Sequence, residues 1–107
     1  MRAQYLSGLV PNTSAALQGP LAVSSAAITL LSLISGNAWH GQTNAVLLSV
    51  ETDQIRICPD GTVPSATKGF LVNPGERAWL TRAEADMAKV IRVTGDAALQ
   101  VSEYKTP

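Results

Sequence analysis

The stretch ICPDGTVPSATKGFLVNPGE, residues 57–76, contains two turn sequences and a short apolar run before the second. Pro59-Asp60-Gly61 has proline for the first central position of a type I turn and a glycine that can adopt the left-handed conformation ending it. Asn73-Pro74-Gly75 has the Pro-Gly order that a type II turn favours. Two sharp corners so close together leave room only for short extended segments, which indicates an all-β chain.

Alternating apolar and polar residues continue on both sides of this stretch. We expect strands at residues 21–24, 27–34, 44–51, 54–58, 69–72, 76–81, 89–93 and 97–103. Both faces of residues 27–34 are apolar, which fits an inner strand, although a helix competes for this segment. Residues 94–96 predict a tight hairpin between the last two strands. About seven or eight short strands at this spacing predict a small antiparallel β-sandwich or barrel, jelly-roll-like in type.

Two segments depart from the strand pattern. Residues 1–19 show no clean periodicity and contain Pro11 and Gly19, so we expect an extended N-terminal arm that contacts a neighbour, followed by a domain at residues 20–107. In residues 81–87, Thr81 and Glu84 have the spacing of a capping box. This predicts a single short helical turn.

The composition limits the class of protein. A chain of 107 residues with 46% hydrophobic and 15% charged residues is long enough for one domain with its own core. Eight basic and eight acidic residues cancel, which argues against direct binding of nucleic acid or an anionic membrane. Cys58 is the only cysteine, so an internal disulfide is excluded. We expect neither a secretory signal nor a membrane span, because the apolar run at 21–34 falls short of about 20 residues.

The charged residues are unevenly distributed along the chain. From Ala3 to Val50 there is no Asp, Glu, Lys or Arg, and His40 alone can titrate. One interpretation is that much of the N-terminal half faces protein in an oligomer. The other is a solvated surface of Ser, Thr, Asn and Gln side chains. The sequence leaves both open.

Residue types that could carry chemistry are few. His40 is the only histidine, so any catalytic triad would need it, and we expect it to be a loop residue. We expect Cys58 to be a small apolar filler and the carboxylates to serve turns. Trp39 and Trp79 are expected in packing, with a ligand platform as the alternative. We therefore predict no catalytic, cofactor-binding or metal-binding residues and no enzyme. Whether Trp39, His40 or Trp79 binds a ligand stays open.

The latter half of the chain has a distinctive order of strands and turns, in VETDQIRICPDGTVPSATKGFLVNPGE at residues 50–76 and AKVIRVTGDAALQVSEY at residues 88–104. Its marks are the Asp60-Gly61-Thr62 corner with Pro64-Ser65, the strand from Gly69 to Val72, the Pro74-Gly75 turn and the final Leu99, Val101 and Tyr104. This order resembles small virion structural proteins of tailed bacteriophages, and the resemblance covers about residues 20–105 with its core in the latter half. Two features depart from the pattern: Cys58-Pro59 stands before the corner, and the N-terminal arm has no counterpart.

The resemblance implies a small β-barrel or sandwich that is part of a virion made in the host cytoplasm. It implies a capsid decoration or cement protein that binds the major capsid protein or other virion proteins, with a homotrimer favoured. A collar, tail or receptor-facing accessory protein is the alternative within the same class. A small carbohydrate-binding module, using Trp39 or Trp79, is the alternative from another class. The resemblance implies no catalytic residue and no cofactor.

Overall fold

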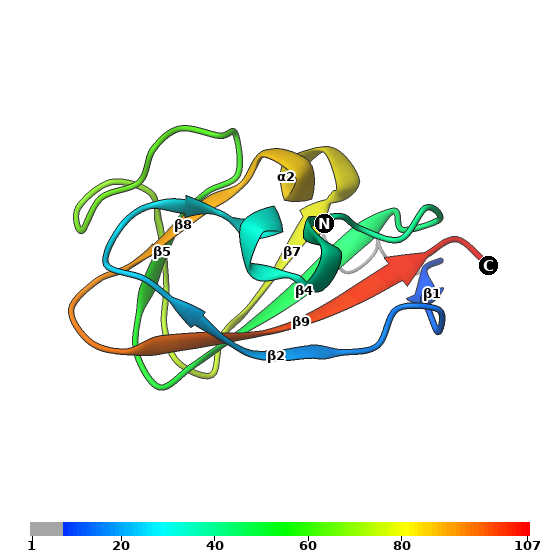
Figure 1. Cartoon of the computed structure of the whole chain (residues 1–107), viewed down its shortest axis with the longest axis horizontal. Coiled ribbons are helices and arrows are strands. Elements are labelled where there is room, and N and C mark those ends of the chain that lie inside the picture. Colours follow the sequence, from blue (N-terminus) through cyan, green and yellow to red (C-terminus); the bar gives the residue numbers. More distant parts are fainter. Residues whose placement is uncertain (1–7) are drawn as a thin grey trace.

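The computed structural model describes residues 8–107, which form two antiparallel sheets packed face to face (Figure 1). In the larger sheet the strands have the order β1-β9-β4-β7, and β2 also pairs with β9. In the smaller sheet the order is β3-β8-β5-β6. The larger sheet consists of β1 (Val10–Pro11), β2 (Gln18–Val23), β4 (Ala45–Glu51), β7 (Arg77–Thr81) and β9 (Ala97–Lys105). The smaller consists of β3 (Ile28–Thr29), β5 (Ile55–Cys58), β6 (Phe70–Val72) and β8 (Lys89–Arg92). The predicted all-β class is confirmed, as an open sandwich and not a closed barrel.

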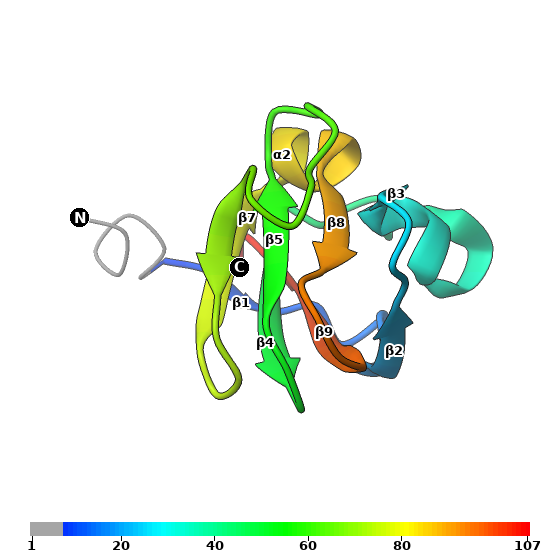
Figure 2. The same ribbon diagram turned by 90° about the vertical axis from the view of Figure 1, so that its left-hand side faces the viewer.

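The chain passes from one sheet to the other at nearly every connection after β2. Within residues 8–107, β5 and β6 are the exception, since they follow each other in the smaller sheet. Eight strands wound in this way, with β2 and β3 at one edge and β7 and β6 at the other, have the jelly-roll arrangement. Figure 2 shows the two edges on opposite sides of the molecule.

The predicted hairpin at residues 94–96 is wrong. β8 pairs with β3 and β5 in the smaller sheet, whereas β9 pairs with β4 along seven residues of the larger sheet. The physical reason is that both strands have an apolar inward face. Val90 of β8 and Leu99 of β9 are both fully buried, which requires them to face the core from opposite sides. Residues 94–96 therefore form the bend that carries the chain between sheets.

The strand predicted at residues 27–34 is also largely wrong. β3 has two residues and is followed by the 3₁₀ turns η1 (Leu30–Leu33) and η2 (Ser35–Asn37). The backbone N–H of Leu30 donates to the carbonyl of Ala88 at 2.8 Å, and the Leu30 side chain is fully buried. The turn places Leu30 and Ile34 in the hydrophobic core. The competing helical interpretation was therefore correct in part.

The predicted turns and the short helix are confirmed. Gly61 N–H bonds the Cys58 carbonyl at 3.3 Å and Glu76 N–H bonds the Asn73 carbonyl at 3.0 Å. Gly61 and Gly75 both have φ of +87°, the left-handed region that favours glycine. Helix α2 (Arg82–Met87) begins with the expected capping box. These local elements connect strands whose buried residues form one core.

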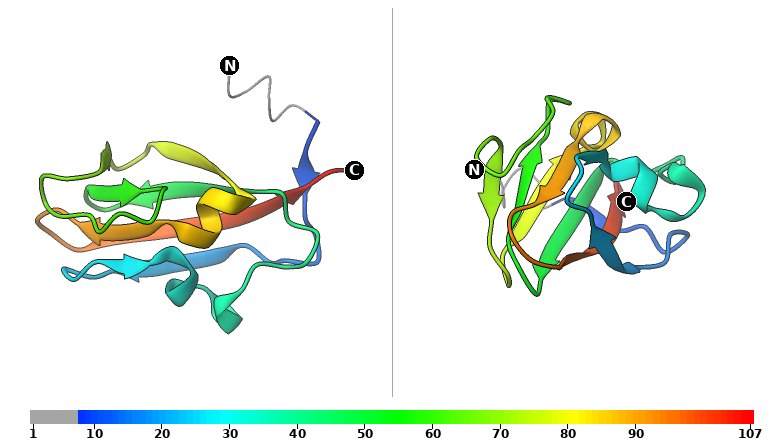
Figure 3. Two further views of the ribbon diagram at one scale, coloured as in Figure 1. Left: turned by 90° about the horizontal axis from the view of Figure 1, so that it is seen from above. Right: turned by 60° about the vertical axis from the view of Figure 1, so that its left-hand side comes forward.

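The core lies between the sheets and is built from the inward positions of the alternating strands (Figure 3). The buried apolar residues of β4, β7 and β9 face those of β5, β6 and β8. They are Val46, Leu48, Val50, Leu80, Leu99 and Val101 on one side and Ile55, Ile57, Val72 and Val90 on the other. This packing fixes the edges and corners that carry the candidate sites.

The first part of the predicted arm, residues 1–7, lies outside the described residues. Residues 10–11 pair with residues 104–105 of β9, and Asn12 is buried. Gln18 already belongs to β2. The boundary at residue 19 and the contact of the arm with a neighbour stay predictions.

Candidate functional site

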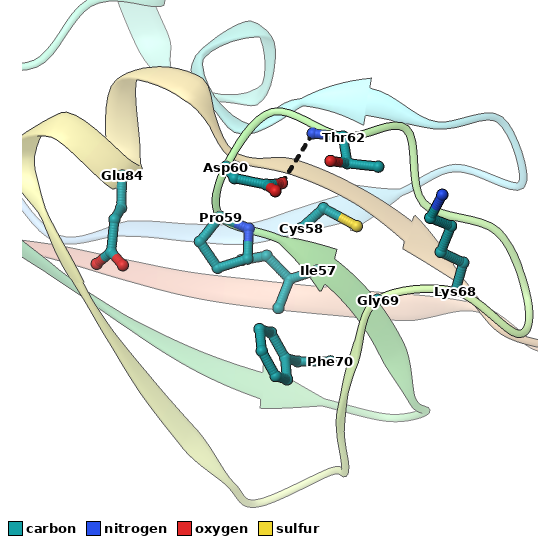
Figure 4. A pocket seen from close by; sticks show the side chains of 9 residues that line it. All are labelled: Ile57, Cys58, Pro59, Asp60, Thr62, Lys68, Gly69, Phe70 and Glu84. Atoms are coloured by element: carbon teal, nitrogen blue, oxygen red, sulfur yellow. Dashed lines mark hydrogen bonds between the residues drawn. The ribbon is translucent and has the colours of Figure 1, made fainter.

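A groove follows the edge of the sandwich where β6 of one sheet lies opposite β7 of the other. It consists of two adjoining hollows of about 560 and 440 Å³. Ile57, Pro59, Phe70 and Glu84 line both hollows. Figure 4 shows the Phe70 ring facing Ile57 and Pro59 in the first hollow, with Glu84 reaching in from α2. We call this groove and its rim the open edge.

The open edge carries unusual apolar exposure. The Phe70 side chain is 70% exposed, Val63 60% and Met87 46%, although these residue types usually pack inside. Val63 belongs to the loop between β5 and β6, and Met87 lies against Gly61 of the corner at the start of that loop. Single exposed apolar residues are ordinary, but a group beside a groove marks an interaction surface.

The corner at residues 58–62 is held by its own hydrogen bonds. Asp60 Oδ1 accepts from the backbone N–H of Thr62 at 3.0 Å. This backbone bond, with a further bond from the Thr62 side chain, lowers the pKa of the Asp60 carboxyl below its usual value, and Lys68 adds a small effect in the same direction. Arg56 donates to the carbonyls of Ala66 and Gly69, which ties the end of the loop to β5. The loop is therefore a rigid rim.

Acidic groups at the open edge already accept hydrogen bonds from their own chain. Glu84 Oε1 accepts from the Thr81 N–H at 2.9 Å in the capping box, and Asp60 accepts from Thr62. Lys68 and Arg77 provide the two basic side chains that line the hollows. The groove thus has two acidic and two basic residues in its lining, beside the exposed ring of Phe70. It combines an apolar wall with charged groups at its rim.

A second site is a buried carboxylate on β9, at the end of the larger sheet where β7 leads into α2. Glu103 is 3% exposed. It accepts from Thr43 Oγ1 at 2.6 Å and from the backbone N–H of His40 at 2.9 Å, and its second oxygen lies 3.3 Å from His40 Nδ1. Asn12 Nδ2 donates to Thr43 Oγ1 at 3.0 Å. The cluster ties the N-terminal segment, the loop before β4, and β9 together.

The sequence interpretation missed this cluster. Its signal was the alternation of residues 97–103, which places Glu103 in line with the inward-facing Ala97, Leu99 and Val101. A carboxylate in that position requires hydrogen-bond donors, because burying an unpaired charge is costly. The donors come from residues far apart in sequence, so spacing alone could not identify them.

The candidate reactive residues are not brought together. His40 is exposed, and its backbone N–H and ring nitrogen Nδ1 face Glu103, whereas Cys58 is buried at the end of β5, close to Gly69. Among the described residues, no three His, Cys, Asp or Glu side chains lie close enough together to hold a metal ion. Several carboxylates have the local roles expected of them: Asp53 bonds the N–H of Gln54, and Glu76 bonds the N–H of Asn73.

The two tryptophans have different environments. Trp39 is 5% exposed, and among residues 8–107 its indole nitrogen has no hydrogen-bond partner. Trp79 is half-buried on the outer face of the larger sheet, where its ring meets Tyr104 edge to face with centroids 4.8 Å apart. Trp39 is a core residue, as expected of packing. Trp79 takes part in an aromatic pair, an arrangement that adds stability.

Comparisons of the chain with protein-family models, with curated proteins and with solved structures find no match. Within the described residues no helix has the length and apolar character needed to cross a membrane.

Proposed function

We propose that this chain is a structural protein of a tailed-bacteriophage virion that decorates or cements the capsid through protein–protein contacts. The observation that carries the proposal is the open edge: a groove with a rigid rim, exposed apolar side chains and acidic groups already bonded by their own chain. A protein that stabilises a shell needs a rigid body and contact area, and a jelly roll is one architecture used in viral capsids. A fold alone does not define a function, so the surface and the resemblance are needed as well.

The remaining parts of the proposal follow from this role. The partners are the major capsid protein or other virion proteins and further copies of the chain, with a trimer favoured. The protein would act without cofactor, nucleic acid or membrane, and it would not be an enzyme. It would be made in the host cytoplasm and act in the virion. The N-terminal arm, residues 1–19, would add a contact with a neighbour.

Two other functions are separable by experiment. A collar, tail or receptor-facing role uses the same kind of surface, with the loop at residues 39–41 and the corner at residues 59–62 as contacts. A carbohydrate-binding module would need exposed aromatic platforms beside carboxylates. Trp39 is buried and Trp79 packs edge to face on Tyr104, and both observations argue against a carbohydrate-binding module. Glycan binding that is lost in Trp79→Ala would support it.

The test is binding to shells. Shells assembled from the coat protein of the same virus, without this chain, would be mixed with the purified protein and sedimented. We expect saturable co-sedimentation and a higher temperature of shell disruption. Absence of co-sedimentation at all protein concentrations would contradict the proposal. A Phe70→Ser variant should bind more weakly, whereas Leu71→Ser, on the opposite face of the same strand, should bind like the wild type.

A further inference from the structure

The segment that precedes β2 is attached to the sandwich at few points. Among residues 8–17, Asn12 and Ala15 are buried, whereas most of the others are exposed. β1 pairs with β9 over two residues, and one of these is Pro11, which has no N–H to donate. In Figure 1, β1 lies beside the end of β9, at the opposite end of the molecule from the bend between β8 and β9. We call residues 8–17 the strap.

Asn12 is the residue that connects the strap to the sandwich. Its backbone N–H donates to the carbonyl of Glu103 at 2.8 Å, and its side-chain Nδ2 donates to Thr43 Oγ1 at 3.0 Å. Two further bonds shape the strap itself. Asn12 Oδ1 accepts from the Ser14 N–H at 3.2 Å, and the Asn12 carbonyl accepts from the Ala15 N–H at 2.9 Å. One residue, 3% exposed, therefore both forms the turn in the strap and holds it against β9.

The buried carboxylate of Glu103 does not depend on the strap. The groups around its two oxygens are the Thr43 hydroxyl and the backbone N–H and ring Nδ1 of His40, all from the loop before β4. Arg82 of α2 donates to the carbonyls of His40 and Thr43, which holds this loop in place. If the strap detached, water would hydrogen-bond to the Asn12 amide and the carboxylate would keep its own partners. Detachment therefore avoids the cost of an unpaired buried charge.

The strap ends at a residue that is firmly held. Gln18 begins β2 and pairs with β9. Its side-chain oxygen accepts from the Ser35 backbone N–H at 2.8 Å, which ties the start of β2 to the turns after β3. Ala16 and Leu17, just before it, are exposed, and Leu17 is 65% exposed. The chain can thus change direction at these two residues while β2 stays in the sheet.

We propose that the strap opens as a unit while the two sheets stay folded, and that Asn12 is the latch that keeps it closed. A segment with few buried contacts opens at a lower free-energy cost than the whole domain. The inference extends the proposed role of the arm, because an open strap adds residues 8–17 to the chain available for contact with a neighbour. Opening is a property of the free chain, so failure of this inference and failure of shell binding are distinguishable.

The first experiment is native-state hydrogen exchange of the full-length chain, followed by NMR. The reporters are the backbone amides of Asn12 and Ala15, and they are compared with the amides of β4. We expect the reporters to exchange faster than the β4 amides. Their exchange should depend little on urea below the unfolding transition, because local opening exposes little surface. Reporters with the same rate and the same urea dependence as β4 would overturn the separate opening of the strap.

The second experiment replaces the latch. Asn12→Ala removes the side-chain bonds to Thr43 and Ser14 but keeps the backbone N–H at residue 12, so both reporters remain. We expect their exchange to become about tenfold faster, still with little dependence on urea. Thr13→Ala, at an exposed position of the same strap, is the matched control and should keep the wild-type rates. Equal reporter rates in the two variants would overturn the assignment of Asn12 as the latch.

Discussion

At the scale of single residues, the Glu103 cluster shows how a buried charge is tolerated in so small a core. The carboxylate has a hydroxyl, a backbone N–H and an imidazole nitrogen around it, each from the loop before β4. Such a group costs little when each lone pair has a donor, and much when a donor is removed. Thr43 is the central member, because it donates to Glu103 and accepts from Asn12.

Thr43→Val should therefore destabilise the fold. The substitution keeps the shape of the side chain but removes the hydroxyl, leaving a buried carboxylate oxygen and the Asn12 amide without that partner. We expect a loss of about 1–3 kcal/mol in the free energy of unfolding, measured by urea denaturation. Thr106→Val, at an exposed position, is the control. Equal stability of Thr43→Val and the wild type would show that the cluster contributes nothing.

Asp60 gives a prediction about pH. Its pKa is lowered mainly by the backbone N–H of Thr62 and further by the Thr62 side chain. A carboxyl whose pKa is lower in the folded chain stabilises the fold above its unfolded pKa, and this contribution disappears as the pH falls through the folded pKa. NMR titration should place Asp60 below aspartate in an unfolded peptide. Thr62→Val should raise the pKa only in part, because the backbone bond remains. An Asp60 pKa at or above the peptide value would contradict this.

At the scale of elements, α2 depends on its cap because it has only six residues. Thr81 and Glu84 satisfy each other's backbone N–H groups. Thr81→Ala should cost about 1 kcal/mol of stability, whereas Thr81→Ser retains the hydroxyl and should cost much less. Hydrogen exchange at the Glu84 amide gives the local measurement, and unchanged protection in Thr81→Ala would argue against the capping box as the cause.

The loop between β5 and β6 depends on Gly69. Its φ of +118° lies in a region that side chains avoid, and an added Cβ would come 3.2 Å from both Cys58 Sγ and the Ile57 carbonyl. Gly69→Ala should therefore destabilise the fold by about 1–3 kcal/mol. Gly41→Ala, where a Cβ meets open space, should have little effect. Thermal denaturation compares the two, and equal melting temperatures would contradict the strained geometry.

The sequence predicted those parts of the fold that depend on neighbouring residues, and it failed where distant residues decide the structure. The turn at Pro59, the turn at Gly75 and the Thr81–Glu84 cap each depend on residues within a stretch of four. Each of these three elements was predicted correctly. The strand prediction at residues 27–34 failed because burying Leu30 in the core outweighed the local preference for an extended strand. The hairpin prediction at residues 94–96 failed because Gly95 indicates a turn but not whether the next strand joins the same sheet or the other one. The groove joins residues from β5, β6, β7 and α2, so no single stretch of sequence revealed it.

At the scale of the whole molecule, the sandwich carries a groove with exposed apolar side chains along its β6–β7 edge, and this is the surface that we propose to meet a partner. A chain without residues 1–7 retains every strand that the structure describes. We expect this truncated chain to fold with the wild-type circular dichroism spectrum but to bind shells more weakly, since the arm would lose a contact with its neighbour. Measured by co-sedimentation, unchanged occupancy would contradict a role for these residues.

The central claim is that the chain decorates a capsid, and cryo-electron microscopy of shells with bound protein tests it most directly. We predict extra density on the outer surface at three-fold or quasi-three-fold positions, in which the jelly roll fits with its open edge against a neighbouring protein. Density confined to the collar or tail of complete particles, with bare shell faces, would contradict the claim and favour the accessory role.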